Sequence, residues 1–181
     1  YIAGQFTIIG VLPMRDLIIS RFKQALTNNV RFCSLRFVEE ITETLSIRRG
    51  VLQPVEEVID SGIMITVHHD GGLGYAATSD YSLNGIKTAI ERACVWASRT
   101  GQQTIFDTND LELAHATGNY HTKVEIPWDE VPLSEKINLL MDIDKRLPID
   151  SRIVDWSASL MSVRVKSLYL TSEGGEVYQQ W

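Results

Sequence analysis

The apolar residues of this chain follow two periods, one typical of β-strands and one typical of α-helices. Alternation with a period of two begins at Val30 and includes Cys33, Leu35 and Phe37, which indicates a sheet with one buried face. It continues over residues 41–48, 51–58, 63–67 and 73–78. Turns are predicted at residues 49–50, 60–62 and 70–72, because glycine accepts positive φ angles without steric cost. The pattern predicts an antiparallel β-meander up to Thr78.

Helical spacing appears in three segments. The first predicted helix runs from Met14 to Leu26, and Pro13 suits its first turn. The second follows N-cap residue types at positions 79–82 and has a continuous apolar face. That face comprises Leu83, Ile86, Ile90, Ala93, Cys94 and Ala97. The third helix opens at Ser134 and stops before Pro148.

Residues 153–170 and 177–181 alternate again and predict further strands around a turn at 172–175. Residues 101–133 show no clear period and are predicted to form an irregular connector. Pro54 cannot donate a ladder hydrogen bond, so it marks a sheet edge or a bulge. The expected class is α+β, an antiparallel β-meander with amphipathic helices packed on one face, followed by the start of a second β-rich region.

Composition narrows the functional classes. The chain has 181 residues, of which 44% are hydrophobic and 22% charged, as in ordinary globular proteins. Its net charge of -6 argues against a nucleic-acid surface, which needs clustered Lys and Arg. No apolar run approaches the roughly 20 residues that span a bilayer. We therefore expect no nucleic-acid partner, no membrane partner and a cytoplasmic protein. The chain begins with Tyr1 and stops within a predicted strand at Trp181, so both ends are expected to be truncated.

Histidines and carboxylates are the first candidates for chemistry. His68, His69 and Asp70 are adjacent, but neighbouring strand residues point to opposite faces and do not readily share one metal ion. We predict that these residues form a polar surface next to the hairpin turn and bind no metal. His115 and His121 lie in the connector without further ligands at metal spacing and are predicted to be solvated.

Three glutamates, Glu39, Glu40 and Glu43, form a second candidate cluster. Glu39 and Glu43 share a strand face about 13 Å apart, which is too far for paired glycosidase carboxylates. A solvated rim is the prediction. Asp142 and Asp144 are assigned to the polar side of the third helix.

Cysteines and glycines offer equally little chemistry. Cys33 and Cys94 have no CxxC spacing and no histidine close in sequence, so they are predicted to be buried, reduced thiols. Gly71, Gly72 and Gly74 precede no helix directly, so hairpin geometry explains them better than phosphate binding. HExxH, HExxxH, GxSxG, P-loop and GxGxxG motifs are absent from the sequence. We therefore assign no catalytic, cofactor-binding or metal-binding residue to this chain.

The order of several segments resembles the amino-terminal domain of the TldD/PmbA family, the zinc metallopeptidases also called modulators of DNA gyrase. The similar segments are SIRRG, DGGLGYAATSD, IERACVWA, PLSEKINLLMDIDKRL and LYLTSEGGEVYQQ. The resemblance implies that residues 1–118 form an amino-terminal α+β domain. Residues 119–181 then supply a connector, a helix and the first strands of a β-rich catalytic domain beyond Trp181.

The resemblance also carries functional expectations. It implies a protein that degrades or processes unfolded peptides, forms homo- or heterodimers, and carries zinc on an HExxxH helix outside this chain. This chain alone is expected to be inactive and to serve as a scaffold, a wall of the substrate channel and a dimerisation part. Our hypothesis is that a sheet edge bordered by Pro54 admits extended peptides, because backbone pairing tolerates many sequences. A dimer partner could equally cover that edge.

Two alternatives stay open. The chain could belong to a noncatalytic subunit that supports an active partner, since the family includes subunits without a complete zinc motif. It could also be a protein-interaction module of the gyrase-modulator type.

Overall fold

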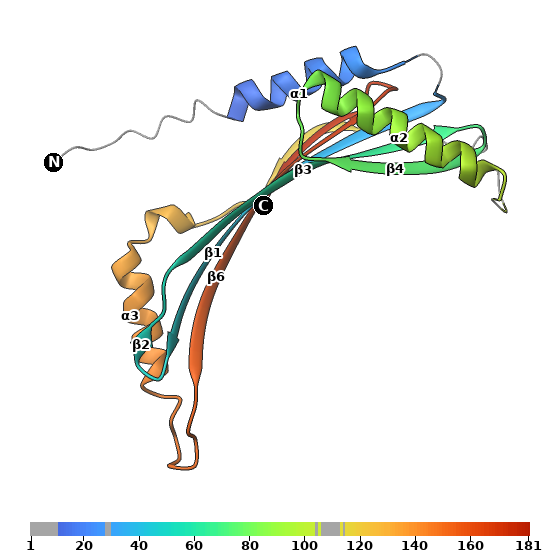
Figure 1. Cartoon of the computed structure of the whole chain (residues 1–181). Helices are drawn as coiled ribbons and strands as arrows, with labels where there is room; N and C mark the ends of the chain where they lie inside the picture. The colour runs from blue at the N-terminus through green and yellow to red at the C-terminus, as the bar shows by residue number, and fades with distance from the viewer. Residues whose placement is uncertain (1–10, 28–29, 104, 106–112, 114) are drawn as a thin grey trace. The chain divides into compact units, whose positions relative to one another are not determined.

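The computed structural model describes residues 11–27, 30–103, 105, 113 and 115–181. Within these residues, three α-helices and a mixed sheet of seven strands confirm the α+β class (Figure 1). In chain order the elements are α1 (Val11–Ala25), β1 (Phe32–Arg48), β2 (Val51–Leu52), β3 (Glu56–His69), β4 (Gly72–Thr78), α2 (Leu83–Gly101), β5 (Thr117–His121), the 3-10 helix η2 (Trp128–Glu130), α3 (Leu133–Asp144), β6 (Ser157–Thr171) and β7 (Glu176–Gln180).

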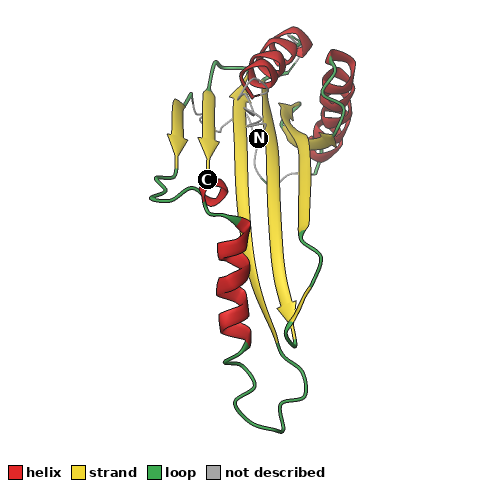
Figure 2. Cartoon of the chain, turned by 90° about the vertical axis from the view of Figure 1, so that its left-hand side faces the viewer, coloured by secondary structure: helices red, strands yellow, loops and turns green. Residues whose placement is uncertain are grey.

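All strands belong to one sheet. Its order is β4-β3-β1-β6-β7-β5, and β2 pairs with β1 (Figure 2). The expected carboxy-terminal strands are present, but β6 lies directly beside β1 instead of starting a separate sheet. The connector predicted for residues 101–133 contains two elements that its sequence did not reveal, β5 and η2.

The hairpin between β3 and β4 forms where the sequence predicted it. Asp70 and Gly71 both have positive φ angles, 51° and 74°, as a two-residue hairpin turn requires. The register runs antiparallel from Ile63 opposite Thr78 to His69 opposite Gly72.

Two local predictions are wrong. The turn expected at residues 60–62 lies inside β3, where the hydroxyl of Ser61 accepts a hydrogen bond of 2.6 Å from Tyr81. The single strand expected over residues 51–58 breaks at 53–55 around Pro54, which lacks the donor that a ladder needs. The α3 helix also begins one residue before Ser134, with Pro132 at its N-cap. It ends at Asp144, ahead of Pro148.

Contacts divide the chain into two compact units. Unit 1 comprises Tyr1–Val38, Ser61–Tyr120 and Ser167–Gln179, and unit 2 comprises Glu39–Asp60, His121–Lys166 and Gln180–Trp181. The long strands β1, β3 and β6 contribute to both. The boundary predicted near residue 118 separates an amino-terminal domain from the start of a catalytic domain. The two compact units do not test this boundary, so it stays a prediction.

Unit 1 holds the larger core, and α1 and α2 contact each other over its strands (Figure 1). Ser82 caps α2, as its hydroxyl accepts a hydrogen bond of 3.0 Å from the amide of Gly85. The helix then packs onto the backbone of β4. A Cβ atom on Gly74 would lie 1.9 Å from the carbonyl oxygen of Ala93, so only glycine fits there.

Unit 2 has a smaller core beneath α3. Leu45, Ile47 and Leu140 are its fully buried apolar residues, and Trp128 and Leu160 are among those that pack against them. The hairpin that joins β1 to β2 begins with Arg49 at a φ of 51°. Unit 2 therefore relies on few apolar side chains.

Candidate functional site

The histidines do not assemble into a metal site. His68 is buried against the edge of Phe32, whereas His69 is partly exposed and lies 3.2 Å from the carboxylate of Asp70. Burial, followed by the charge of Arg31, lowers the pKa of His68, so its ring is held neutral. Within the described residues, no three His, Cys, Asp or Glu side chains gather closely enough to hold a metal ion.

The two connector histidines belong to different units. Both are exposed, as predicted. The Nδ1 atom of His115 lies 3.3 Å from the backbone oxygen of Glu173, within unit 1. His121 belongs to unit 2 and lines a cavity there.

Two of the three β1 carboxylates have lysine partners, whereas Glu40 is exposed as predicted. Glu39 lies 2.9 Å from Lys166, and Glu43 lies 3.5 Å from Lys136. The rim prediction is wrong for Glu43, whose side chain is 17% exposed. The Nζ atom of Lys136 also lies 3.8 Å from the centre of the Trp128 ring, a cation–π contact. These acids therefore stabilise unit 2 and are not free for acid–base chemistry.

The two α3 aspartates have different environments. Asp142 is exposed and bonds Lys145 at 3.0 Å, as a residue on the polar face should. Asp144 is buried, and its Oδ1 atom has no hydrogen-bond partner among the described residues, so its assignment to the polar face is wrong. The helix turns this position towards the Gly50 turn, where a Cβ atom would lie 3.9 Å from Oδ2.

The cysteines are poorly suited to nucleophilic chemistry. Both thiols are free, and burial raises the pKa of Cys33 to about 12. Burial also raises the pKa of Cys94. The glycines of the hairpin likewise have structural roles, because α2 lies against the backbone of Gly72 and Gly74. Phosphate therefore has no access to these amides.

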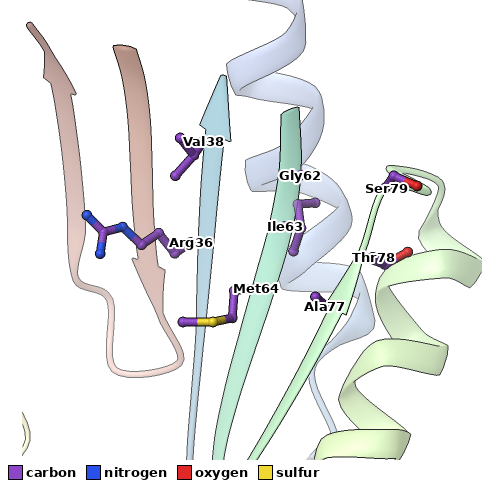
Figure 3. Close-up of a pocket in the computed structure, with 8 residues that line it drawn as sticks. All are labelled: Arg36, Val38, Gly62, Ile63, Met64, Ala77, Thr78 and Ser79. Atoms are coloured by element: carbon purple, nitrogen blue, oxygen red, sulfur yellow. The ribbon is translucent and has the colours of Figure 1, made fainter. Parts of the chain in front are cut away.

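One open hollow lies on the unit 1 sheet, on the face away from α2, with a volume of about 560 Å³. Figure 3 shows Arg36, Val38 and Met64 extending to one side of β1 and β3. Gly62, Ile63, Ala77, Thr78 and Ser79 complete its lining. A Cβ atom on Gly62 would meet only the Thr78 carbonyl, at 3.8 Å, so packing does not require glycine there.

A second cavity of about 270 Å³ lies in unit 2, between the strands and residues 121–124. Its lining includes Lys166 and Arg164, which are paired with Glu39 and Asp129. Since both cations already have carboxylate partners, the cavity offers little free charge to a ligand.

The clearest candidate for binding is the outer edge of β3. The register with β4 ends at the Ile63–Thr78 pair, so β3 runs on over Glu56–Gly62 without a β4 partner. In the strand order β3 has only β4 and β1 as neighbours, so its outer backbone groups are unpaired along this stretch of the described chain. The sequence placed the edge near Pro54, and the structure extends it.

No helix in the described part of the chain is both long enough and apolar enough to cross a membrane.

Comparison with known proteins identifies the fold. Residues 33–97 match the family model described as PmbA/TldA metallopeptidase domain 1. No curated protein sequence matches this chain.

Three solved structures share the fold. A protein named as a modulator of DNA gyrase from Bacteroides thetaiotaomicron superposes with a TM-score of 0.67 at 15% identity over 91% of this chain. A protein of the same description from Thermotoga maritima gives 0.62 at 17% identity over 93%. TldE from Thermococcus kodakarensis gives 0.62 at 16% identity over 92%.

This chain spans only 38%, 37% and 36% of the three structures, respectively. The match of residues 33–97 and the shared fold agree with the resemblance found in the sequence segments. The comparisons therefore show that residues 33–97 are similar to domain 1 of the PmbA/TldA metallopeptidase family, and that the chain shares the fold of the three solved structures.

Proposed function

We propose that this chain is the substrate-binding part of a TldD/PmbA-type metallopeptidase that acts on unfolded peptides. The observation that carries the proposal is the unpaired outer edge of β3 over Glu56–Asp60, within unit 2. The description of the matching family as a metallopeptidase supports the reaction class. The chain itself contributes binding, and catalysis is assigned to the remainder of the full-length protein.

Backbone pairing suits such a substrate. An extended peptide that joins the edge of a sheet is held by main-chain hydrogen bonds, which do not depend on its side chains. A protein that processes unfolded chains of many sequences needs this tolerance. The exposed side chains of Glu56, Val58 and Asp60 leave the edge accessible within unit 2.

Zinc is part of the proposal for the full-length protein only. The described residues of this chain do not gather a ligand set that fits zinc, because zinc sites need three or four close His, Cys or carboxylate groups. We therefore assign no metal ligand and no catalytic step to residues of this chain.

Hydrolysis of a labelled, unstructured peptide by the full-length protein tests the reaction. We expect turnover that a zinc chelator abolishes and added zinc restores. A folded protein with stoichiometric zinc but no turnover of any unstructured peptide would contradict the peptidase assignment.

A second measurement tests the edge itself. Methylation of alternate backbone nitrogens removes the donors that a peptide offers to a neighbouring strand, without changing its side chains. We expect the methylated peptide to bind about tenfold more weakly than its parent, since each lost hydrogen bond contributes about 1 kcal/mol. Equal affinities would exclude pairing along β3.

A further inference from the structure

The edge of β3 continues a longer exposed segment, residues 51–60, which we call the edge segment. All of it lies in unit 2. Five of its side chains are large, apolar and exposed, with Val51 and Ile59 each 62% exposed. The other three are Leu52, Val55 and Val58. So many exposed apolar residues within one short segment are typical of an interaction site.

The same segment is strongly acidic. Glu56, Glu57 and Asp60 are its charged residues, and it contains no Lys or Arg. None of these carboxylates has a hydrogen bond or an ion pair among the described residues, whereas Glu39 and Glu43 each have a lysine. The edge segment therefore presents uncompensated negative charge beside the unpaired outer backbone of residues 56–60.

Protection against aggregation explains only part of this composition. Charged residues on an edge strand do prevent unwanted pairing, and three acids would serve that purpose. A purely protective edge would not also expose Val51, Val58 and Ile59, since these residues favour strand association. Exposed apolar residues together with acidic residues fit an edge that pairs with certain strands better than an edge that prevents all pairing.

Charge also decides which strand can pair here. A second copy of the edge segment would bring two sets of carboxylates into neighbouring positions, and like charges across a ladder are destabilising. A strand with Lys or Arg would instead place opposite charges across the ladder. Glu56, Val58 and Asp60 lie on one face of β3, because side chains two positions apart in a strand share a face. The complementary strand has an apolar residue opposite Val58 and a basic residue two positions to either side.

We propose that the edge segment selects extended peptides in which Lys or Arg residues flank apolar residues. This inference rests on the proposed function and specifies its substrate class. The exposed apolar side chains contact the apolar residues of the peptide, and the three carboxylates pair with its cations. Acidic unfolded segments are discriminated against by the same charges.

Three labelled peptides test the selectivity by fluorescence polarisation with the full-length protein in the presence of a zinc chelator. They share a central Val, and the residues two positions before and after it are Lys in the first, Gln in the second and Glu in the third, so that all three positions lie on one strand face. We expect the Lys peptide to bind about tenfold more tightly than the Gln peptide at low salt, and the Glu peptide to bind most weakly. Raising the salt concentration should narrow these differences.

Two triple variants locate the effect. Glu56→Gln/Glu57→Gln/Asp60→Asn should reduce the preference for Lys over Gln to less than about twofold, because only the edge charges are removed. Glu125→Gln/Glu130→Gln/Glu135→Gln makes the same change of net charge at exposed positions elsewhere in unit 2, so it should retain the preference. All six positions are exposed, and circular dichroism checks that both variants are folded.

The outcomes separate this inference from the proposed function. Equal binding of the Lys and Gln peptides, with methylation still weakening both, overturns the charge selectivity and leaves the edge intact. A preference for Lys that survives the edge triple variant also overturns it. Failure of all three peptides to bind overturns both proposals.

Discussion

Unit 1 and unit 2 bury different kinds of side chain beneath their helices. In unit 1, α1 and α2 cover a large apolar cluster, and α2 lies directly on the β4 backbone at Gly74. In unit 2, α3 covers a few apolar residues together with the charged side chains of Lys136 and Asp144. Apolar burial is the main source of folding free energy, so unit 1 should contribute most of the stability. The exposed edge segment belongs to the less strongly packed unit.

The largest expected effect breaks the close packing in unit 1. Gly74→Ala places a Cβ atom within 1.9 Å of the Ala93 carbonyl oxygen, so α2 must move away from β4. We expect the free energy of unfolding, measured by urea denaturation, to fall by about 3 kcal/mol. Gly118→Ala is the matched control in β5, where a Cβ atom would meet nothing within 4 Å. A Gly74→Ala variant as stable as the control would refute this account of α2 packing.

The buried charge of unit 2 should give the next largest effect. Lys136→Met leaves Glu43 without its cation in a site that is 17% exposed, and we expect a loss of about 2 kcal/mol. Adding Glu43→Leu removes the stranded carboxylate and should recover most of that loss. Lys166→Met disrupts a pair that is about one third exposed, so its cost should stay below about 1 kcal/mol. If Lys136→Met and Lys166→Met lower the free energy of unfolding equally, burial does not determine how much each ion pair contributes to stability.

The buried His68 should make the stability of unit 1 depend on pH. Because burial lowers the pKa of His68, the unfolded chain binds a proton at this residue at a higher pH than the folded chain does. Stability should therefore fall as the pH drops below about 6.5, the ordinary pKa of histidine, towards the lowered value in the folded state. Unfolding experiments at pH 7.5 and 5.5 should show a smaller difference for His68→Leu than for the parent. An equal pH dependence in His68→Leu and in the parent would contradict the assignment.

The smallest effect on stability is expected at the hollow of unit 1. Gly62→Val should raise the free energy of unfolding by about 0.5 kcal/mol, because Gly62 meets no steric limit and glycine weakens a strand. The new side chain also occupies part of the hollow that Gly62 lines. A destabilisation above about 1 kcal/mol in thermal unfolding would show that the glycine is structurally required.

Local chemistry made part of the fold predictable. The Asp70–Gly71 turn and the Ser82 cap depend on a few neighbouring residues, so their sequence signals were sufficient. The insertion of β6 beside β1 depends on pairing between distant segments, which local periodicity does not encode. β5 was missed for a related reason, because all its residues are exposed and show no apolar alternation.

The candidate site shows the same limit. The lysine partners of Glu39 and Glu43 come from β6 and α3, and local periodicity does not reveal contacts between such distant segments. The unpaired edge was only partly predictable from Pro54. Its full extent follows from lengths, since β3 has 14 residues and β4 has 7, so the first half of β3 has no β4 partner on its outer side.

Amide hydrogen exchange tests the central claim most directly, because it reports which backbone groups a bound peptide protects. The full-length protein is compared with and without a saturating concentration of the Lys peptide. The account predicts slower exchange over residues 56–60 and little change over Thr117–His121, the strand at the other end of the sheet order. Binding of the peptide with unchanged exchange over residues 56–60 would contradict it.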